Sequence, residues 1–105
     1  MYNGKVIDIT SRISNEPKFV KIGEKSYKVD DRKNTVLEVM QLMDEGGTGV
    51  STIDKALEKL VGKDAVKDFE EYSLADYQTV FIAVMACVQG VSYEECEKSF
   101  RRLGG

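Results

Sequence analysis

The chain has 105 residues, of which 42% are hydrophobic and 31% charged, and its formal net charge is −3. This length and composition fit a single domain, residues 1–105, with one core, and they exclude a disordered chain. The acidic balance argues against general nucleic-acid binding, and two cysteines without histidine supply neither a typical zinc site nor the usual base for an activated nucleophile.

The first 30 residues are predicted to hold the β-structure. Residues 5–9, Lys-Val-Ile-Asp-Ile, favour a short strand, and the polar stretch 11–17, which contains the only proline, favours a loop. Residues 19–29 then predict a β-hairpin that turns at Gly23-Glu24-Lys25, because each strand places its apolar residues on one face. These apolar residues are Val20, Ile22, Tyr27 and Val29. Two strands alone are barely stable, so this face must lie on helices.

The hairpin region is also basic. Residues 18–33 contain six basic and three acidic residues, in a chain that is acidic as a whole. One interpretation is a solvated outer face whose lysines discourage edge-to-edge pairing. The other is a basic docking face for an acidic partner.

Residues 31–105 are predicted to be helical. Asp30, Asp31 and Asn34 are candidate N-caps of a first helix that should end near Glu45. Its apolar stripe comprises Val36, Val39, Met40 and Met43.

A glycine-rich hinge follows at residues 46–49, Gly-Gly-Thr-Gly. It does not match a phosphate-binding loop, because Val50-Ser51 stands where such a loop needs a lysine and a hydroxyl residue. A second helix is predicted to begin at Ser51 and to end at Gly62, and a short third helix covers residues 63–71. The apolar positions of these two helices are Ile53, Ala56, Leu57, Leu60, Val61, Val66 and Phe69.

The fourth helix contains an unbroken run of nine apolar residues, Val80–Val88, between a cap at Ser73 and a stop at Gly90. A membrane span needs about 20 such residues, so we expect this helix to be buried in protein and not in a membrane. One face of this helix carries Leu74, Tyr77, Phe81, Val84 and Val88. We expect its Phe81–Val84–Val88 part to form the spine of the core. We expect the chain's own elements to leave the other apolar side uncovered: Ile82, Met85 and Ala86.

The last helix is predicted to begin with the capping box Ser92-Tyr-Glu-Glu95, with Glu97 paired to Arg101. The break at Gly90 also permits an alternative, a helix-turn-helix of a small DNA-binding regulator or antitoxin. Its recognition helix would carry Lys98, Arg101 and Arg102. Three glutamates in the first half of that helix, at positions 94, 95 and 97, would face the phosphate backbone and oppose this role.

A serine at a helix start and the two cysteines are further candidates for chemically reactive sites. Ser73-Leu74 at a helix start is similar to the modified serine of acyl carrier proteins, but Tyr72 stands where their aspartate precedes that serine. A carrier or accessory subunit therefore stays a secondary alternative. Cys87 and Cys96 lie on adjacent predicted helices, and we expect them to act as small apolar residues without a functional disulfide.

The order of these parts resembles the tail assembly chaperones of long-tailed bacteriophages and prophages. The resemblance covers three segments: the hairpin 19–31 with Asn34–Met43 directly after it, the middle helices around Ala56–Ala65, and Leu74–Phe100, where an apolar helix breaks at Gly90. The segment before Pro17 has no counterpart in this pattern.

The resemblance implies a function. Proteins of this family bind the tape-measure protein and keep it soluble during tail assembly. It implies a non-enzymatic protein without cofactors, in the bacterial cytoplasm and outside the mature virion, that binds the tape-measure protein and the tail-tube protein. We also expect self-association, because an excess of apolar helix surface can be shared between copies. The family offers no catalytic motif to carry over.

The expected fold is α+β and mainly α, with an N-terminal β-hairpin packed on a bundle of four to five short helices. A chaperone needs apolar surface that its own core does not use, and methionine suits adaptable contacts. The candidate partner-binding residues are therefore Met40, Met43, Phe81, Ile82 and Met85.

Overall fold

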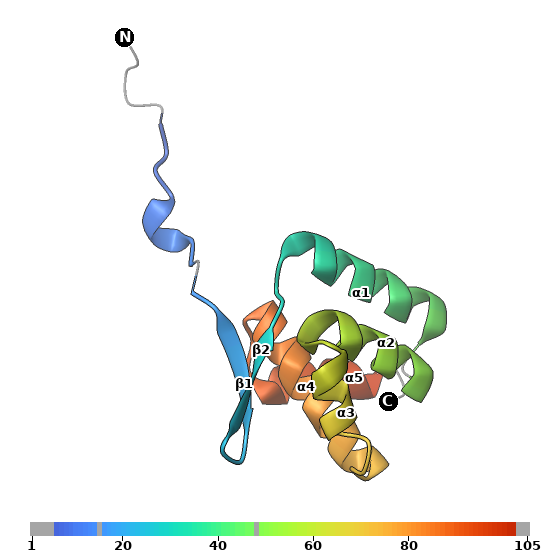
Figure 1. The fold of residues 1–105 in the computed structure, drawn as a ribbon. Coiled ribbons are helices and arrows are strands. Elements are labelled where there is room, and N and C mark those ends of the chain that lie inside the picture. The colour runs from blue at the N-terminus through green and yellow to red at the C-terminus, as the bar shows by residue number, and fades with distance from the viewer. Residues whose placement is uncertain (1–5, 15, 48, 103–105) are drawn as a thin grey trace.

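The computed structural model describes residues 6–14, 16–47 and 49–102 (Figure 1). Within them, an antiparallel hairpin precedes five helices. The strands are β1 (Lys18–Ile22) and β2 (Lys25–Val29), and the helices are α1 (Lys33–Gly46), α2 (Val50–Val61), α3 (Lys63–Asp68), α4 (Leu74–Gln89) and α5 (Tyr93–Arg102). This confirms the predicted α+β, mainly α fold, with the hairpin on a helical bundle.

The hairpin turns its apolar face to the helices as predicted. Val20 pairs with Tyr27 across the two strands, so their side chains share one face. Ile22 pairs with Lys25, which leaves a two-residue turn, one residue shorter than expected. Gly23 takes a φ of 62° at the first turn position, which is the requirement of a type II′ turn. This face packs against α4 and α2.

The predicted strand at residues 5–9 is wrong over residues 6–9, which form no strand; Lys5 lies outside the described residues. We call residues 6–14 the N-terminal arm. A short 3-10 turn, Thr10–Arg12, follows Asp8, whose carboxylate accepts a hydrogen bond of 3.0 Å from the backbone N–H of Thr10. The arm runs away from the hairpin (Figure 1), so its backbone meets no neighbouring strand with which to form a ladder.

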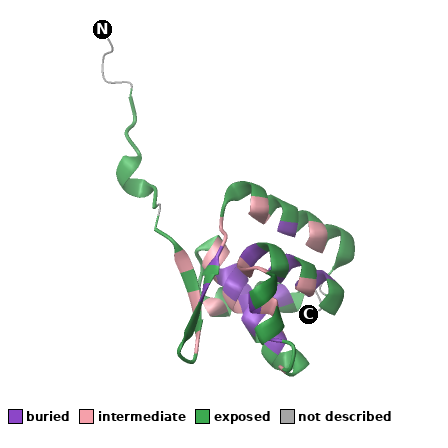
Figure 2. Ribbon diagram, viewed as in Figure 1, coloured by how far each residue is buried: buried purple, intermediate pink, exposed green. Residues whose placement is uncertain are grey.

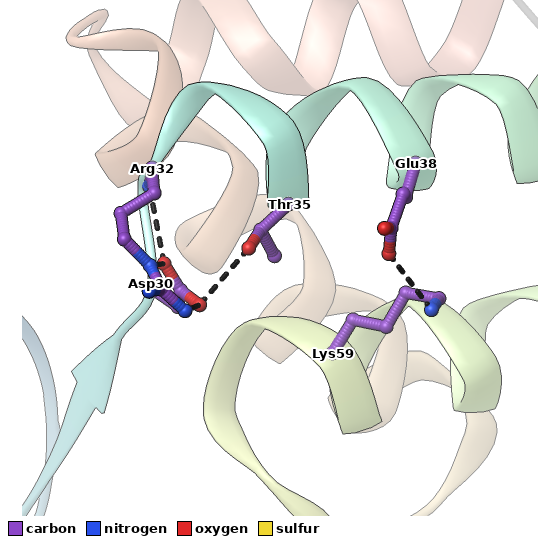
Figure 3. Close-up of polar contacts among 5 residues, drawn as sticks. All are labelled: Asp30, Arg32, Thr35, Glu38 and Lys59. Carbon is purple, nitrogen blue, oxygen red and sulfur yellow. Dashed lines mark hydrogen bonds and ion pairs between the residues drawn. The ribbon is translucent and has the colours of Figure 1, made fainter.

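The start of α1 is fixed by a polar cluster instead of a simple N-cap side chain. Arg32 occupies the N-cap position without a side-chain cap. Asp30 accepts hydrogen bonds from Arg32 Nε at 2.9 Å and from Thr35 Oγ1 at 3.0 Å (Figure 3). These contacts lower the pKa of the Asp30 carboxyl well below its usual range, with the Arg32 side chain as the largest cause. Asp30 thus acts from outside the helix, whereas the sequence suggested a direct cap.

Helices α1 and α2 form a helical hairpin. Val39 is fully buried between them, and Lys59 Nζ lies 3.0 Å from Glu38 Oε2 across the pair (Figure 3). At the corner, Thr52 Oγ1 donates a hydrogen bond of 3.1 Å to the carbonyl oxygen of Gly46. The predicted hinge at 46–49 is therefore the turn between two packed helices, with its Thr48 outside the described residues.

Helix α4 lies at the centre of the core, and Figure 2 shows its buried residues in purple. Its predicted ends are confirmed. Ser73 Oγ accepts a hydrogen bond of 3.1 Å from the N–H of Asp76, and Gly90 takes the left-handed conformation with a φ of 70°. The hairpin, α2 and α5 surround this helix.

The prediction that one apolar side of α4 stays uncovered is wrong. Ile82 is 4% exposed, and Met85 and Ala86 are each 5% exposed. The reason is that different neighbours cover different sides of the helix, so a helix that is apolar nearly all round is buried nearly all round. On the face predicted to point to the core, Leu74 in the first turn is exposed and Val88 near the end is half-buried.

The remaining helices differ from expectation in small ways. Helix α3 ends at Asp68, three residues earlier than predicted, and Phe69 follows it into the core. Helix α5 begins after Ser92, whose Oγ accepts a hydrogen bond of 3.2 Å from the N–H of Glu95, and it packs on α4 through Phe100. Among the described residues, no single helix is long and apolar enough to cross a membrane; α4 and α5 meet that criterion only as a pair, bent by 114°.

Candidate functional site

The structure separates the five predicted partner-binding residues. Phe81, Ile82 and Met85 are buried in the chain's own core, so a partner cannot reach them in this conformation. Met43 is half-buried against the core. Met40 is exposed on α1. Of the five candidate residues, the three on α4 are therefore inaccessible, and Met40 is the most exposed.

Met40 belongs to a small apolar surface that we call the α1 flank, formed by Leu37 and Met40. Both side chains are about half exposed. They lie one turn apart on α1, beside the stripe through which Val39 packs on α2. Helix α1 packs chiefly on α2 and lies at the edge of the bundle (Figure 1), which explains why this flank has no cover.

A second apolar surface is a groove of about 350 Å³ between the start of α2, α3 and the start of α4. We call it the α2–α4 groove. Phe69 and Tyr77 are buried at its base, while Leu74 is 55% and Val50 is 48% exposed at its rim. The other lining residues are Asp54, Val66, Glu70 and Tyr72.

The base of the groove is held by an aromatic cluster. The ring of Phe69 lies 5.1 Å from that of Tyr27, 5.5 Å from that of Tyr72 and 6.4 Å from that of Tyr77, measured between centroids. Such tilted and edge-on pairs are stabilising beyond the area they bury. The groove therefore lies on a base of packed aromatic rings.

The groove is acidic as well as apolar. The hydroxyl of Tyr77 donates a hydrogen bond to the carboxylate of Asp54. Burial and then this hydrogen bond raise the pKa of Tyr77 well above its usual value, so the phenol stays a protonated donor. Glu70 adds a second carboxylate to the lining. A groove with an aromatic base, aliphatic rim and two carboxylates suits an amphipathic segment with apolar anchors and basic neighbours.

Sequence reasoning missed Val50 and Leu74. Each follows directly after the N-cap residue of its helix, Gly49 and Ser73. Side chains in a first turn lie at the end of the bundle, where burial is incomplete. An apolar residue directly after a helix cap was the signal that could have indicated this rim.

Aspartates pair with half of the basic residues in the hairpin region. Lys18 Nζ lies 2.9 Å from Asp31 Oδ2, Lys25 pairs with Asp68, and Arg32 pairs with Asp30. Three of the six basic residues between positions 18 and 33 are thus paired with aspartates. This favours the solvated outer face over a basic docking face.

Neither cysteine shows signs of reactivity. Cys87 and Cys96 are both free thiols, and burial raises the pKa of each above its usual value. A raised pKa disfavours the thiolate, which is the reactive form. In residues 6–14, 16–47 and 49–102, no group of three or more aspartate, glutamate or cysteine side chains is placed to hold a metal ion.

The chain is a small α+β domain with two exposed apolar surfaces, the α1 flank and the α2–α4 groove. No family model, curated protein or solved structure matches the chain.

Proposed function

We propose that this protein is a phage tail assembly chaperone that binds the tape-measure protein and keeps it soluble until the tail tube assembles around it. The observation that supports this most is the α2–α4 groove, with Val50 and Leu74 exposed over an aromatic base. The proposal places the protein in the cytoplasm of the bacterial host and outside the mature virion, and makes the tail-tube protein a second candidate partner. It assigns no catalytic residue and no cofactor.

The strength of such a groove fits a reversible chaperone. Fully burying a leucine or valine side chain contributes about 1.5–3 kcal/mol, and about half of each rim side chain is already covered. Val50 and Leu74 together therefore contribute on the order of 2 kcal/mol to a complex. A client bound through several such contacts is held, yet it is released when tail assembly offers it a better surface.

Charge adds selectivity to the groove. Asp54 and Glu70 flank the apolar surface, so a client helix with lysine or arginine beside its apolar face is preferred over an acidic one. The α1 flank, Leu37 and Met40, offers a second and separate contact for a long client. A long helical client that meets two weak surfaces gains avidity without a single tight site.

Co-expression tests the proposal. The wild-type chain and the tape-measure protein of the same phage or prophage are produced together, and the soluble fraction of the tape-measure protein is measured. The variant Leu74→Glu places a charge at the groove rim and should return most of the client to the insoluble fraction. Val91→Glu is the matched control, because Val91 is also an exposed apolar residue but does not line the groove.

The outcomes are distinct. Loss of solubility with Leu74→Glu but not with Val91→Glu supports both the function and the site. A client that stays insoluble with the wild-type chain, with no complex on gel filtration, would refute the chaperone function. Equal effects of the two variants would refute the groove as the binding site.

The alternative of a small DNA-binding regulator has one observation in its favour. Helices α4 and α5 are bent by 114° across the break at Gly90, within the range of about 90–120° typical of a helix-turn-helix. Lys98, Arg101 and Arg102 are exposed on α5, but its first turn carries Glu94 and Glu95. Duplex DNA titrated at low salt decides this point: binding that weakens steeply with added salt would favour the regulator.

A further inference from the structure

The N-terminal arm carries an apolar surface that the rest of the chain does not use. Ile7 is 85% exposed, and Val6, Ile9 and Ile13 are each about half exposed or more. In Figure 2 the described part of the arm is exposed throughout, away from the body. Four exposed aliphatic side chains on one short segment form the kind of apolar surface that marks a protein interaction site.

The arm also has the pattern of a strand. In Val6-Ile7-Asp8-Ile9, an extended backbone would place Ile7 and Ile9 on one face and Val6 and Asp8 on the other. Isoleucine and valine favour strands, but a strand forms only where a neighbour accepts its backbone hydrogen bonds. The segment thus has the residues of a strand, but it lacks a neighbouring strand to form backbone hydrogen bonds with.

The hairpin offers such a ladder at the outer edge of β1. The two-residue turn makes Ile22 and Lys25 a hydrogen-bonded pair, and in an antiparallel ladder these pairs alternate with pairs that are not hydrogen-bonded. Phe19 and Lys21 belong to the second kind, so their N–H and C=O groups point away from β2. The sheet has two strands in the described residues, and this edge is unpaired.

The burial of the hairpin shows on which side a third strand is missing. On β2, Tyr27 and Val29 are buried, whereas on β1, Val20 and Ile22 are only half-buried. All four lie on the face that packs against the helices. The apolar layer therefore stays incomplete along β1, where an added strand would continue it.

We propose that the arm of one copy of this chain adds as an antiparallel third strand to the β1 edge of a second copy, and that the second copy returns the same contact. The register that matches chemistry places Asp8 opposite Lys21. It then places Ile9 beside Val20 and Ile7 beside Ile22, on the apolar face. Carboxylate and ammonium meet on the solvent face, and opposite charges at paired positions stabilise a sheet.

A second copy is the occupant because the arm leaves its own β1 in the opposite direction (Figure 1). Its apolar side chains are carried away from the edge that would receive them. A reciprocal exchange covers both arms and both edges with one two-fold contact, which closes the assembly at a dimer. The exchange replaces the Asp8–Thr10 contacts of the isolated arm with a strand ladder.

This inference is independent of the chaperone proposal. No residue of the arm or of β1 lines the α2–α4 groove. A failure of the arm exchange therefore leaves the groove and its client untouched, and a failure of client binding leaves the dimer untouched.

Sedimentation equilibrium of the full chain tests the exchange with charge variants. Asp8→Lys and Lys21→Asp should each raise the dimer dissociation constant by about tenfold, since like charges then oppose each other at two symmetric places. The double variant Asp8→Lys/Lys21→Asp restores the opposite-charge pair and should restore the wild-type constant. Lys28→Asp is the control, because Lys28 lies on β2 and the same solvent face.

Cysteine pairing fixes the geometry. An Asp8→Cys chain mixed with a Lys21→Cys chain should form a mixed disulfide dimer, and an Asp8→Cys chain mixed with a Lys28→Cys chain should not. A wild-type chain that stays monomeric at every concentration would overturn the proposal, even if the arm became protected on a client. A disulfide within one chain of Asp8→Cys/Lys21→Cys would also overturn it, because the arm would then fold onto its own edge.

Discussion

The hydroxyl of Tyr27 donates a hydrogen bond of 3.0 Å to Oδ2 of Asp68, and this contact joins the hairpin to the end of α3. The ammonium of Lys25 pairs with the same carboxylate. Lys25 first and Tyr27 second lower the pKa of Asp68 below its usual value. The tyrosine ring also meets Phe69 edge-on, so one side chain links the hairpin, α3 and the base of the groove.

Tyr27→Phe should therefore lower the free energy of unfolding by about 1 kcal/mol, because it removes one hydrogen bond to a carboxylate and keeps the ring. Urea unfolding measures this difference. Tyr72→Phe is the matched control: the Tyr72 ring also packs on Phe69, but its hydroxyl makes no hydrogen bond to the described residues. Equal losses in the two variants would contradict the role given to the Asp68 contact.

Because of Asp30, the free energy of unfolding should decrease at acidic pH. Its pKa is lowered in the folded state, chiefly by Arg32, so its contribution is present above the unfolded pKa of about 4 and is lost as the pH falls below that value. Asp30→Asn should cost about 1 kcal/mol at pH 7, and the difference from wild type should shrink in acid.

Urea unfolding at neutral and acidic pH measures this effect. Asp44→Asn serves as the control, because Asp44 is an exposed residue near the other end of α1, and its side chain makes no hydrogen bond or ion pair with the described residues. Its difference from wild type should stay small at every pH. A constant difference for Asp30→Asn across the range would contradict the assigned cause.

Gly46 should resist replacement although it lies in a helix. In a helix interior, alanine is more favourable than glycine by about 1 kcal/mol. At position 46, however, the added Cβ would collide with Oγ1 of Thr52. Gly46→Ala should therefore lower the free energy of unfolding of the wild type and raise that of a Thr52→Ala chain. Unfolding of the four chains of this cycle gives the coupling, and strict additivity would refute the contact.

Two of the three serines at predicted helix starts, Ser73 and Ser51, should behave differently when replaced. Ser73→Ala removes the side-chain cap of α4 and should cost about 1 kcal/mol. Ser51→Ala should cost less than about 0.5 kcal/mol, because α2 begins at Val50 with Gly49 as its N-cap and no side-chain cap. Thermal or urea unfolding compares them, and a larger loss for Ser51→Ala would contradict these helix ends.

The sequence predicted those parts of the fold that depend on local signals. Ser73 and Gly90 bound α4, Ser92 caps α5, and the alternation in the hairpin gives its buried face, because each signal acts within a few residues. The prediction of a strand at residues 5–9 failed over residues 6–9 for the opposite reason. Its propensity is local, but its ladder partner must come from elsewhere.

The candidate site was predicted only in part. Met40 is accessible as expected, whereas Ile82 and Met85 are buried on α4, which packs against the hairpin, α2 and α5. Periodicity shows that a helix is apolar all round but not which neighbour will cover each side. The groove likewise depends on how α3 and the start of α4 meet α2, so Val50 and Leu74 stand out only in three dimensions.

The central claim is that this domain binds a helical client through the α2–α4 groove. The most direct test is methyl NMR of the labelled chain titrated with a soluble helical segment of the tape-measure protein. We predict that the methyl signals of Val50, Val66 and Leu74 shift with saturation, while that of Val91 stays in place. The absence of any shift, or shifts confined to residues outside the groove, would contradict the account.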